Sequence, residues 1–377
     1  MTIPHQICNR CIMDTSDPKI SFDAKGICTH CARFDQRART ILITKDEKRR
    51  RLGSLVNKIK TSGQNKPYDC VIGLSGGIDS TYLAYQVKSL GLRPIAVHLD
   101  NGWNSELSVA NIESVVKKLN IDLITRVLNW QDFRDLQLAF LEASTPDSEI
   151  PTDHAIYAVL LEVAHKQGVR YILSGTNFST ESVMPFSWSN GHRDWRYIRG
   201  IHKRFGKRSK ALEQYPHFSF LEYAYFRIIK GIRFVSFLNL LDYKKEEAIT
   251  LIQEKLGWRN YGGKHYESNY TKFYQGYLLP HKFGFDKRRA HLSSLILSGQ
   301  VSREAALVEI KKAAYPENEL QRDLEFVAKK LELNFEQLQG ILAKPKKTFE
   351  DYDSYEKSCW YRIIFKIAEN LKYGKAL

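Results

Sequence analysis

One short stretch constrains the fold of this chain more than any other: an apolar run at residues 71–74 leads directly into Ser75-Gly76-Gly77-Ile78-Asp79-Ser80. The apolar run is typical of a buried parallel strand, and a helical period of apolar residues begins near Ser80. A strand joined to a helix by a tight turn is the basic unit of α/β folds. The helix is expected to pack four residues against the strand: Leu83, Ala84, Val87 and Leu90.

Short apolar runs and helical periods continue to alternate along the chain. Strands are expected at 68–74, 94–99, 122–128 and 169–173, and helices at 80–90, 107–119, 132–142 and 153–166. This pattern predicts a doubly wound α/β protein with a parallel sheet. Strand signals fade beyond about residue 215, and helical periods appear at 218–229, 244–256, 303–312 and 320–331.

Four parts follow from these shifts in pattern. We expect a cysteine-bearing module at 1–35, a basic helical connector at 36–62, the α/β core at 63–215 and a mainly helical substrate or partner region at 216–377.

The turn after the first strand has the properties of a phosphate-binding loop. Gly76 and Gly77 let backbone N–H groups approach a ligand without a Cβ in the way, and the following helix offers free donors and its positive dipole end. No Gly-Lys-[Ser/Thr] follows, so the loop is not a Walker A loop and γ-phosphate transfer is disfavoured. The alternative is a glycine-rich turn without a ligand.

The loop sequence Ser-Gly-Gly-Ile-Asp-Ser resembles the pyrophosphate-binding loop (PP-loop) of the ATP pyrophosphatases, which include GMP synthetase, NAD synthetase, argininosuccinate synthetase and tRNA thiolases. The resemblance implies a fold like that of the adenine nucleotide α-hydrolases, cleavage of ATP between its α- and β-phosphates, and a magnesium ion near Asp79. It assigns the loop's ATP contacts to Ser75, Gly76, Gly77, Asp79 and Ser80.

Two further polar loops are expected at the carboxyl edge of the sheet, where α/β proteins bind ligands. One follows the second strand and the other follows the fourth, where the resemblance places a second adenylate contact. Either loop could instead carry no ligand. The candidate ATP contacts there are His98, Asp100, Gly175, Thr176, Asn177 and Glu181.

Four of the six cysteines form two close pairs, Cys8-x2-Cys11 and Cys28-x2-Cys31. Two such pairs separated by sixteen residues have the spacing of a zinc ribbon, in which four thiolates hold one structural Zn²⁺. Iron, or four unligated thiols, remain alternatives. The other two, Cys70 and Cys359, are expected to be buried, and no cysteine between them could carry a persulfide, which weakens a role in thiolation.

Residues 185–210 interleave arginines and lysines with aromatic rings. Guanidinium groups pair with phosphate oxygens and aromatic faces stack on bases, so the segment suits a nucleotide-sugar diphosphate or an RNA strand. A solvated basic face is the alternative. The candidate substrate contacts in this segment are Arg193, Trp195, Arg196, Lys203 and Arg204.

A second glycine pair, at 262–263, precedes Lys264, His265 and Glu267. These side chains could stabilise charge at the reacting centre or transfer a proton, and together with Asp79 they are the candidate catalytic residues. A structural turn before a helix is the alternative.

Several motifs together resemble the N-acetyl sugar amidotransferases of lipopolysaccharide O-antigen and surface-sugar biosynthesis. They are the cysteine pairs, the PP-loop, Pro-Thr-Asp-His-Ala-Ile at 151–156, Gly-Gly-Lys-His-Tyr-Glu-Ser at 262–268 and Lys-Phe-Gly-Phe-Asp-Lys-Arg at 282–288. The resemblance implies that ATP activates the acetamido oxygen of a nucleotide-linked sugar as an O-adenylyl imidate. Ammonia from a separate glutaminase, alone or with a cyclase-like subunit, then gives an acetamidino group. Asp153 is the candidate substrate contact in the second motif.

The bulk properties leave two rival functions open. A net charge of +15 favours anionic partners, so a tRNA-modifying enzyme of the thiolase or lysidine-synthase type and a nucleotide-regulated RNA-binding protein are the alternatives. No apolar stretch approaches the ~20 residues of a membrane helix, and the N-terminal residues do not resemble a secretory signal. We therefore expect a cytoplasmic protein.

Overall fold

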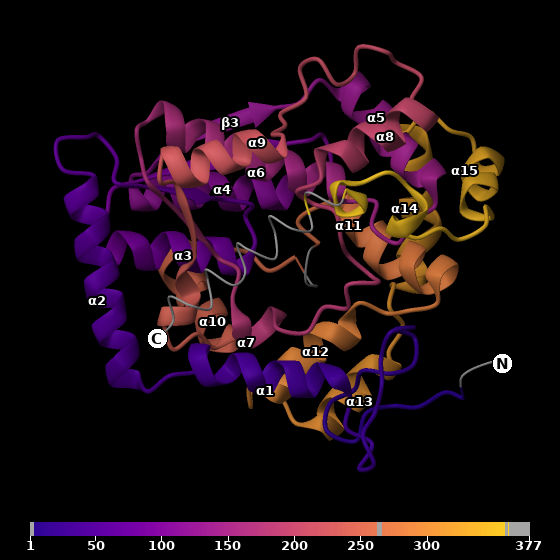
Figure 1. The fold of residues 1–377 in the computed structure, drawn as a ribbon, viewed down its shortest axis with the longest axis horizontal. Coiled ribbons are helices and arrows are strands. Elements are labelled where there is room, and N and C mark those ends of the chain that lie inside the picture. The colour runs from indigo at the N-terminus through magenta and orange to yellow at the C-terminus, as the bar shows by residue number, and fades with distance from the viewer. Residues whose placement is uncertain (1–3, 262–265, 359–360, 362–377) are drawn as a thin grey trace.

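The computed structural model describes residues 4–261, 266–358 and Tyr361 (Figure 1). Its centre is a five-stranded sheet with the order β3-β2-β1-β4-β5, in which every pair of neighbouring strands is parallel. The predicted α/β fold with a parallel sheet is confirmed. The strands are β1 (Cys70–Gly73), β2 (Pro94–Asp100), β3 (Asp122–Val127), β4 (Tyr171–Ser174) and β5 (Arg233–Ser236).

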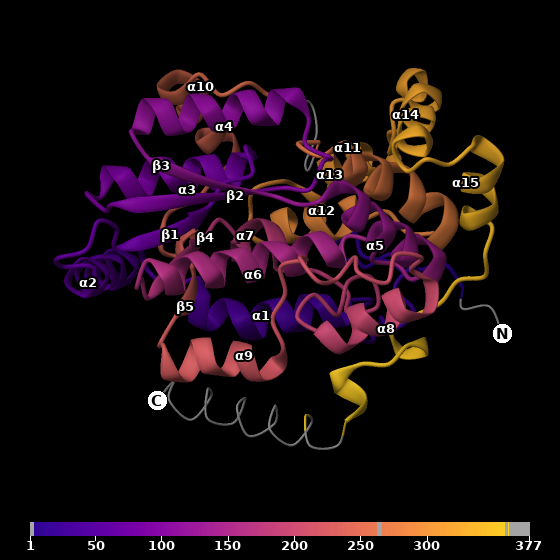
Figure 2. The same cartoon turned by 90° about the horizontal axis from the view of Figure 1, so that it is seen from above.

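Helices cover both faces of this sheet, because successive residues of a strand point to opposite sides. Val71 belongs to one hydrophobic core, with α5 and α6, whereas Ile72 belongs to a second core, with α2, α3, α4 and α10. Figure 2 shows α3 and α4 on one side of the sheet and α6 on the other. The helices of these layers are α2 (Lys45–Ser62), α3 (Ile78–Ser89), α4 (Glu106–Leu119), α5 (Trp130–Ala143), α6 (Ile150–Lys166) and α10 (Lys245–Leu256).

The central strand β1 determines where a ligand can lie. It pairs with β2 on one side and β4 on the other, so the chain leaves its carboxyl end at the point where the strand order reverses direction. Ligands of open α/β sheets bind in the crevice at such a reversal. The residues that follow β1, β2 and β4 therefore meet at one edge of the sheet.

The sheet extends beyond the part of the chain in which strands were expected. Strand β5 lies after residue 215, in the region predicted to be mainly helical, and it pairs with β4 from Tyr171 opposite Arg233 to Ser174 opposite Ser236. It has four residues and is exposed at both ends, so it carries neither a long apolar run nor a clear alternation. A short edge strand of this kind gives little periodic signal.

The basic connector expected at 36–62 is not one helix. Helix α1 (Thr29–Ile41) begins inside the cysteine module and ends before α2, because Thr44 accepts the backbone N–H of Glu47 and starts a new helix. Helix α1 therefore joins the N-terminal cysteine module to the rest of the protein.

Short helices dominate the remainder of the described chain. Ser302 caps α13 by accepting the backbone N–H of Ala305. No helix among the described residues is long and apolar enough to cross a membrane. The elements not yet given are α7 (Phe178–Glu181), α8 (Trp195–Phe205), α9 (Phe220–Ala224), η1 (Tyr225–Ile229), η2 (Phe237–Leu240), α11 (Asn269–Phe273), η3 (Tyr274–Phe283), α12 (Arg288–Leu297), α13 (Arg303–Lys311), α14 (Glu317–Lys330), α15 (Phe335–Leu342), η4 (Phe349–Asp351) and η5 (Tyr355–Lys357).

Candidate functional site

The loop between β1 and α3 is held in shape by its own side chains. The Ser75 hydroxyl accepts the backbone N–H of Gly77 at 3.3 Å and lies 3.1 Å from the hydroxyl of Ser80. Ser80 in turn donates to the carbonyl of Gly77 at 3.2 Å. Helix α3 starts at Ile78, so the predicted strand, glycine turn and helix N-terminus are all present. The loop is therefore prearranged to receive an anion with backbone N–H groups.

Close contacts around this loop favour glycine at three positions. Gly76 has φ +79°, and a Cβ there would lie 2.5 Å from the carbonyl oxygen of Ser108. A Cβ on Gly175 would lie 3.0 Å from the backbone carbonyl of Asp79. A Cβ on Gly77 would meet the Glu267 carboxylate at 3.3 Å. The loop after β4 and the segment around Glu267 thus close on the phosphate loop from two sides.

Two tyrosines from the C-terminal part face the acidic residue of the loop. Tyr243 donates its hydroxyl hydrogen to the carboxylate of Asp79. The Tyr261 hydroxyl lies 3.3 Å from the position that a Cβ on Gly77 would occupy. Burial, with the charges of Asp79 and Glu267, raises the pKa of the Tyr261 hydroxyl, so it stays protonated and can donate a hydrogen bond.

The end of β2 supplies a second polar group at the same edge. His98 is buried, and burial lowers its pKa, so its imidazole is neutral. Its Nδ1 lies 3.0 Å from the carbonyl of Leu74, which precedes the loop, and its Nε2 lies 3.1 Å from the amide of Asn104. Asn104 also donates to Asp100 at 3.2 Å. His98 and Asp100 therefore lie where the sequence predicted them, connected to the loop through Leu74.

The residues after β4 line the other side of this edge. Thr176 lies 3.2 Å from Ser236 at the end of β5, and Asn177 caps α7 by accepting the backbone N–H of Thr180 at 2.9 Å. Glu181, the last residue of α7, is close enough for its charge to act on Tyr243. The candidate ATP contacts from three strands therefore gather around one loop.

The candidate catalytic residues of the 262–268 motif divide into two groups. Glu267 lies against the phosphate loop, as its contact with Gly77 shows, and its backbone carbonyl accepts the N–H of Ser105 at 2.9 Å. Lys264 and His265 lie outside the described residues.

A second group of titratable side chains surrounds the first turn of α6. His192 Nε2 lies 3.1 Å from Asp147 and 3.3 Å from Asp153, and Ser189 donates to Asp147 at 2.6 Å. Asp153 is thus in a charged cluster, but its carboxylate already has His192 as a partner. Glu149 accepts a hydrogen bond from Thr271.

Some side chains of the basic segment at 185–210 pack against the rest of the protein. Trp195 is 7% exposed and stacks on His217 at 4.1 Å between ring centroids, so the expectation that its face is open to a base is not met. The guanidinium of Arg193 lies over the rings of Tyr157 and Tyr223 at 5.0 and 5.4 Å. Arg204 similarly lies over the ring of its neighbour Phe205.

The exposed face of α8 forms a basic groove of about 790 Å³. Arg196 and Lys203 line it together with Arg199 and Lys207, and Asp353 pairs with Arg196 at 2.8 Å. Arg196 and Lys203 were expected to contact substrate, and the four cations form a surface suited to an anion.

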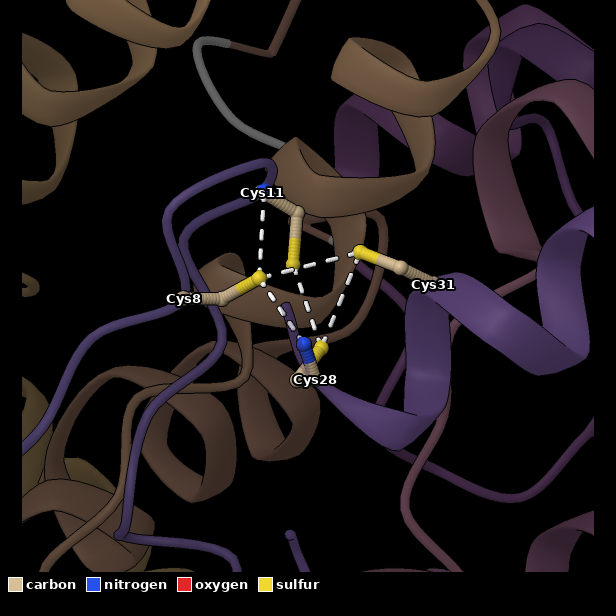
Figure 3. Close-up of side chains that lie close together, drawn as sticks. All are labelled: Cys8, Cys11, Cys28 and Cys31. Carbon is tan, nitrogen blue, oxygen red and sulfur yellow. Dashed lines mark hydrogen bonds between the residues drawn. The ribbon is translucent and has the colours of Figure 1, made fainter. Parts of the chain in front are cut away.

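The four clustered cysteines converge in space as predicted (Figure 3). Their sulfur atoms lie within 4.8 Å of one another, with Cys8–Cys31 at 3.7 Å and Cys11–Cys28 at 3.6 Å. A tetrahedral Zn²⁺ with Zn–S bonds of about 2.3 Å separates its sulfur ligands by about 3.8 Å. Backbone N–H groups point at the thiolates, as from Cys28 to Cys8 at 3.3 Å. The cluster therefore fits a structural zinc ion.

The cysteine module is attached to the C-terminal helices (Figure 1). Arg303 donates to the carbonyls of Cys8 at 2.8 Å and Cys11 at 3.1 Å. Arg289 contacts Asp14 at 3.0 Å, and Ser293 accepts the backbone N–H of Ile12. The module and helices α12 and α13 therefore form one packed unit.

Family models match two parts of the chain. Residues 49–209 match the model of the NAD synthase family, which makes the core a domain of the PP-loop ATP pyrophosphatase superfamily. That superfamily uses ATP with Mg²⁺. Residues 267–368 match the model described as LPS biosynthesis protein WbpG-like, C-terminal domain. The chain thus joins a PP-loop core to a WbpG-like C-terminal domain, which confirms the resemblance found in its motifs.

One curated relative matches a shorter part of the chain. The tRNA-specific 2-thiouridylase MnmA 2 of Fusobacterium nucleatum is 32% identical over 125 residues, or 31% of this chain. The match covers 36% of that protein, so the chain spans about a third of the length of this relative.

Comparison with solved structures also gave matches. They include a predicted subunit of tRNA methyltransferase from Methanocaldococcus jannaschii, 18% identical over 49% of this chain and 74% of that one, with a TM-score of 0.28. The NH3-dependent NAD synthetase of Campylobacter jejuni is 14% identical over 57% and 94%, with a TM-score of 0.30. The NMN synthetase of Francisella tularensis is 16% identical over 56% and 94%, with a TM-score of 0.29.

Some residues at the site were not found from sequence. Tyr243 lies in no recognisable motif, and its approach to Asp79 depends on packing. Trp258 donates to the carbonyl of Gly76 at 2.8 Å from just before the second glycine pair. Glu149 stands two residues before the Pro-Thr-Asp-His-Ala-Ile motif and four before Asp153, which places both carboxylates on one side of a helix start. The four-residue spacing between Glu149 and Asp153 was the sequence signal that could have identified Glu149.

Proposed function

We propose that this protein is an ATP-dependent amidotransferase that converts an acetamido group of a nucleotide-linked sugar into an acetamidino group. The observation that carries the proposal is the position of Glu267. It is the first residue of the match to the WbpG-like domain, and its carboxylate lies against Gly77 of the phosphate loop. The domain of a surface-polysaccharide family and the ATP loop therefore contribute to one site.

The chemistry requires activation of a poor electrophile. The acetamido oxygen attacks the α-phosphorus of ATP, the bond to the β-phosphate breaks and pyrophosphate leaves, which gives an O-adenylyl imidate. Ammonia then displaces AMP. The backbone N–H groups of the loop would bind the leaving pyrophosphate. Tyr243 would orient the Asp79 carboxylate, which would hold magnesium. A bound magnesium ion would neutralise part of the negative charge of the phosphates.

We extend the same proposal to the partners of this protein and to its location in the cell. The cations of the α8 groove would serve the anionic substrate or partner, and a separate glutaminase would supply ammonia. Such a reaction takes place in the cytoplasm, where ATP and nucleotide sugars are made.

A second candidate is an ATP-dependent tRNA-modifying enzyme, which the match to a tRNA thiouridylase favours over part of the chain. Cys70 does not support thiolation, since it is fully buried in β1 and burial raises the pKa of its thiol. A nucleotide-regulated RNA-binding protein without turnover is the third reading.

Pyrophosphate release separates these functions. The purified protein with ATP, Mg²⁺ and ammonium chloride should release pyrophosphate when UDP-linked N-acetylhexosamines or diacetamido sugars are added, and mass spectrometry should detect the amidine. Asp79→Ala should form no AMP while its circular dichroism spectrum is unchanged. Release stimulated by tRNA but by no nucleotide sugar would favour the second function, and binding of ATP without release would favour the third.

A further inference from the structure

A cluster of acids and bases lies at the first turn of α6. It contains Asp147, Glu149 and Asp153 from the start of the helix, His192 from the loop before α8, and Lys287 from the start of α12. The proposed activation of the acetamido oxygen by ATP uses none of these groups except Asp153, so the cluster is available for the second half of the reaction.

The cluster is joined to the ATP site by short hydrogen-bonded steps. Thr271, the partner of Glu149, lies four residues after Glu267, and its backbone N–H is capped by Ser268 at 3.2 Å. Ser268 pairs with Asn104, which contacts His98 and Asp100 at the end of β2. The first turn of α6 is also tied to the end of β2, because Asn101, which follows β2, donates to Thr152 at 3.0 Å.

Glu149 differs from its neighbours in proton affinity. Burial raises its pKa to about 7; Asp153 and Asp147 act in the same direction, and Lys287 and the hydrogen bond from Thr271 oppose them. By contrast, the charged partner His192 and the charge of Lys287 bring the pKa of the buried Asp147 to about 2. Burial alone would lower the pKa of His192, but Asp147 and Asp153 raise it above its usual value.

Exposure, contacts and proton affinity together indicate which of these groups can act as a base. A base that works near neutral pH must have a pKa near 7 and must reach solvent-borne reactants. Glu149 is partly exposed, whereas Asp147 is buried and engaged by both Ser189 and His192. His192 lies between the carboxylates of Asp147 and Asp153, whose charges raise its pKa, so it positions them.

We propose that Glu149 is the base that accepts the proton of the incoming ammonia, an inference that rests on the proposed amidotransferase function. The ammonia nitrogen forms a bond to the imidate carbon, and the resulting ammonium group gives one proton to the Glu149 carboxylate. The bond between that carbon and the adenylyl oxygen then breaks, and AMP leaves with the electron pair. The products are the amidine, AMP and one proton held by Glu149, which passes to solvent.

Glu149→Gln tests this role because it keeps the size of the side chain and an oxygen that can accept from Thr271. Two reactions are measured with the full chain: exchange of labelled pyrophosphate into ATP in the presence of the acetamido sugar, and formation of amidine with ammonium chloride. The variant should keep pyrophosphate exchange within about threefold of wild type and lose at least about a hundredfold in amidine formation, in the range usual for loss of a general base. Glu162→Gln, farther along α6 and paired with Lys166, is the matched control.

Two further readouts separate a proton acceptor from a structural residue. At a fixed concentration of free ammonia, amidine formation by wild type should fall below about pH 7, and the variant should lose this dependence. Hydroxylamine, whose protonated adduct is far more acidic than that of ammonia, should restore much of the variant's rate.

Equal loss of pyrophosphate exchange and amidine formation in Glu149→Gln would overturn the role of Glu149, as would an unchanged pH profile. Wild-type protein that shows no exchange with any acetamido sugar would overturn the proposed function and, with it, the inference that depends on it.

Discussion

Tyr243 donates its hydroxyl hydrogen to the carboxylate of Asp79, although the two residues are 164 positions apart in the chain. Asp79 belongs to the first turn of α3, directly after the phosphate loop, and Tyr243 lies just before α10. Helices α3 and α10 pack together in the core on the same side of the sheet. The orientation of the loop's acidic side chain is therefore set by the part of the chain that follows β5.

Removal of this hydrogen bond should weaken the use of ATP without unfolding the protein. Tyr243→Phe keeps the buried ring, so its Tm should stay within a few degrees of wild type, while kcat/KM for ATP should fall about 10- to 150-fold. That factor follows from the ~1.5–3 kcal/mol of a hydrogen bond to a charged group. Steady-state kinetics with varied ATP measures it. Tyr85→Phe, on the same helix as Asp79, serves as the control, and an unchanged kcat/KM in Tyr243→Phe would contradict the role of the hydroxyl.

The cysteine cluster should contain about one zinc ion per chain, since four thiolates saturate a tetrahedral site. Elemental analysis of the purified protein checks this, and Cys8→Ser with Cys28→Ser should remove the metal. Iron, or no metal in the wild-type protein, would overturn the assignment.

Arg303 should stabilise the metal module from outside it. In Arg303→Met the carbonyls of Cys8 and Cys11 lose their donor, so zinc should pass faster to a chelator and the Tm should fall by roughly 5 °C. Arg322→Met, in an exposed position on α14, should change neither quantity. Equal rates of zinc loss in the two variants would show that Arg303 does not support the module.

Glu149 should also make stability depend on pH. Its folded pKa of about 7 lies above the ordinary value of 4.5, so the stability that the protonated carboxyl contributes is complete below pH 4.5 and is lost as pH rises through 7. Glu149→Gln should therefore gain stability over wild type on raising the pH from 5 to about 8.5, by an amount on the order of a few kcal/mol. Urea unfolding at both pH values measures the difference. A gain independent of pH would mean that the carboxyl is already ionised at pH 5.

The chain should not produce ammonia from glutamine. A glutaminase nucleophile must be an exposed thiol with a base beside it, but the four clustered cysteines face one another and Cys70 is buried in β1. Cys359 lies outside the described residues. Amidine should form with ammonium chloride and not with glutamine until a glutaminase is added. Turnover with glutamine alone would direct attention to Cys70 and Cys359, and replacing each with serine would identify the nucleophile.

Local patterns predicted the parts of the fold that local chemistry determines. The glycine loop, strands β1 to β4 and the four clustered cysteines all depend on residues close together in sequence, and their positions agree with the prediction. Strand β5 was missed because a four-residue edge strand starting at Arg233 lacks a long apolar run.

The candidate site was predicted only in part for a related reason. The positions of His98 and Gly175 follow from the rule that strand ends meet at one edge, whereas those of Tyr243 and Tyr261 depend on how the C-terminal part folds back. Trp195 illustrates the opposite error. An aromatic residue among arginines was read as a stacking surface, but its ring is covered by His217 and Tyr215.

The attachment of Cys8 to Arg303 spans 295 residues, and it links the start of the chain to a helix near its other end. During synthesis at about 5–20 residues per second, the cysteine module leaves the ribosome roughly 15–60 seconds before Arg303 exists. In that interval a zinc ion bound by the four cysteines would have to hold the module together, because its packing surface on α12 and α13 has not been made. Zinc depletion should therefore impair the folding of newly synthesised chains more than it affects chains that have already folded.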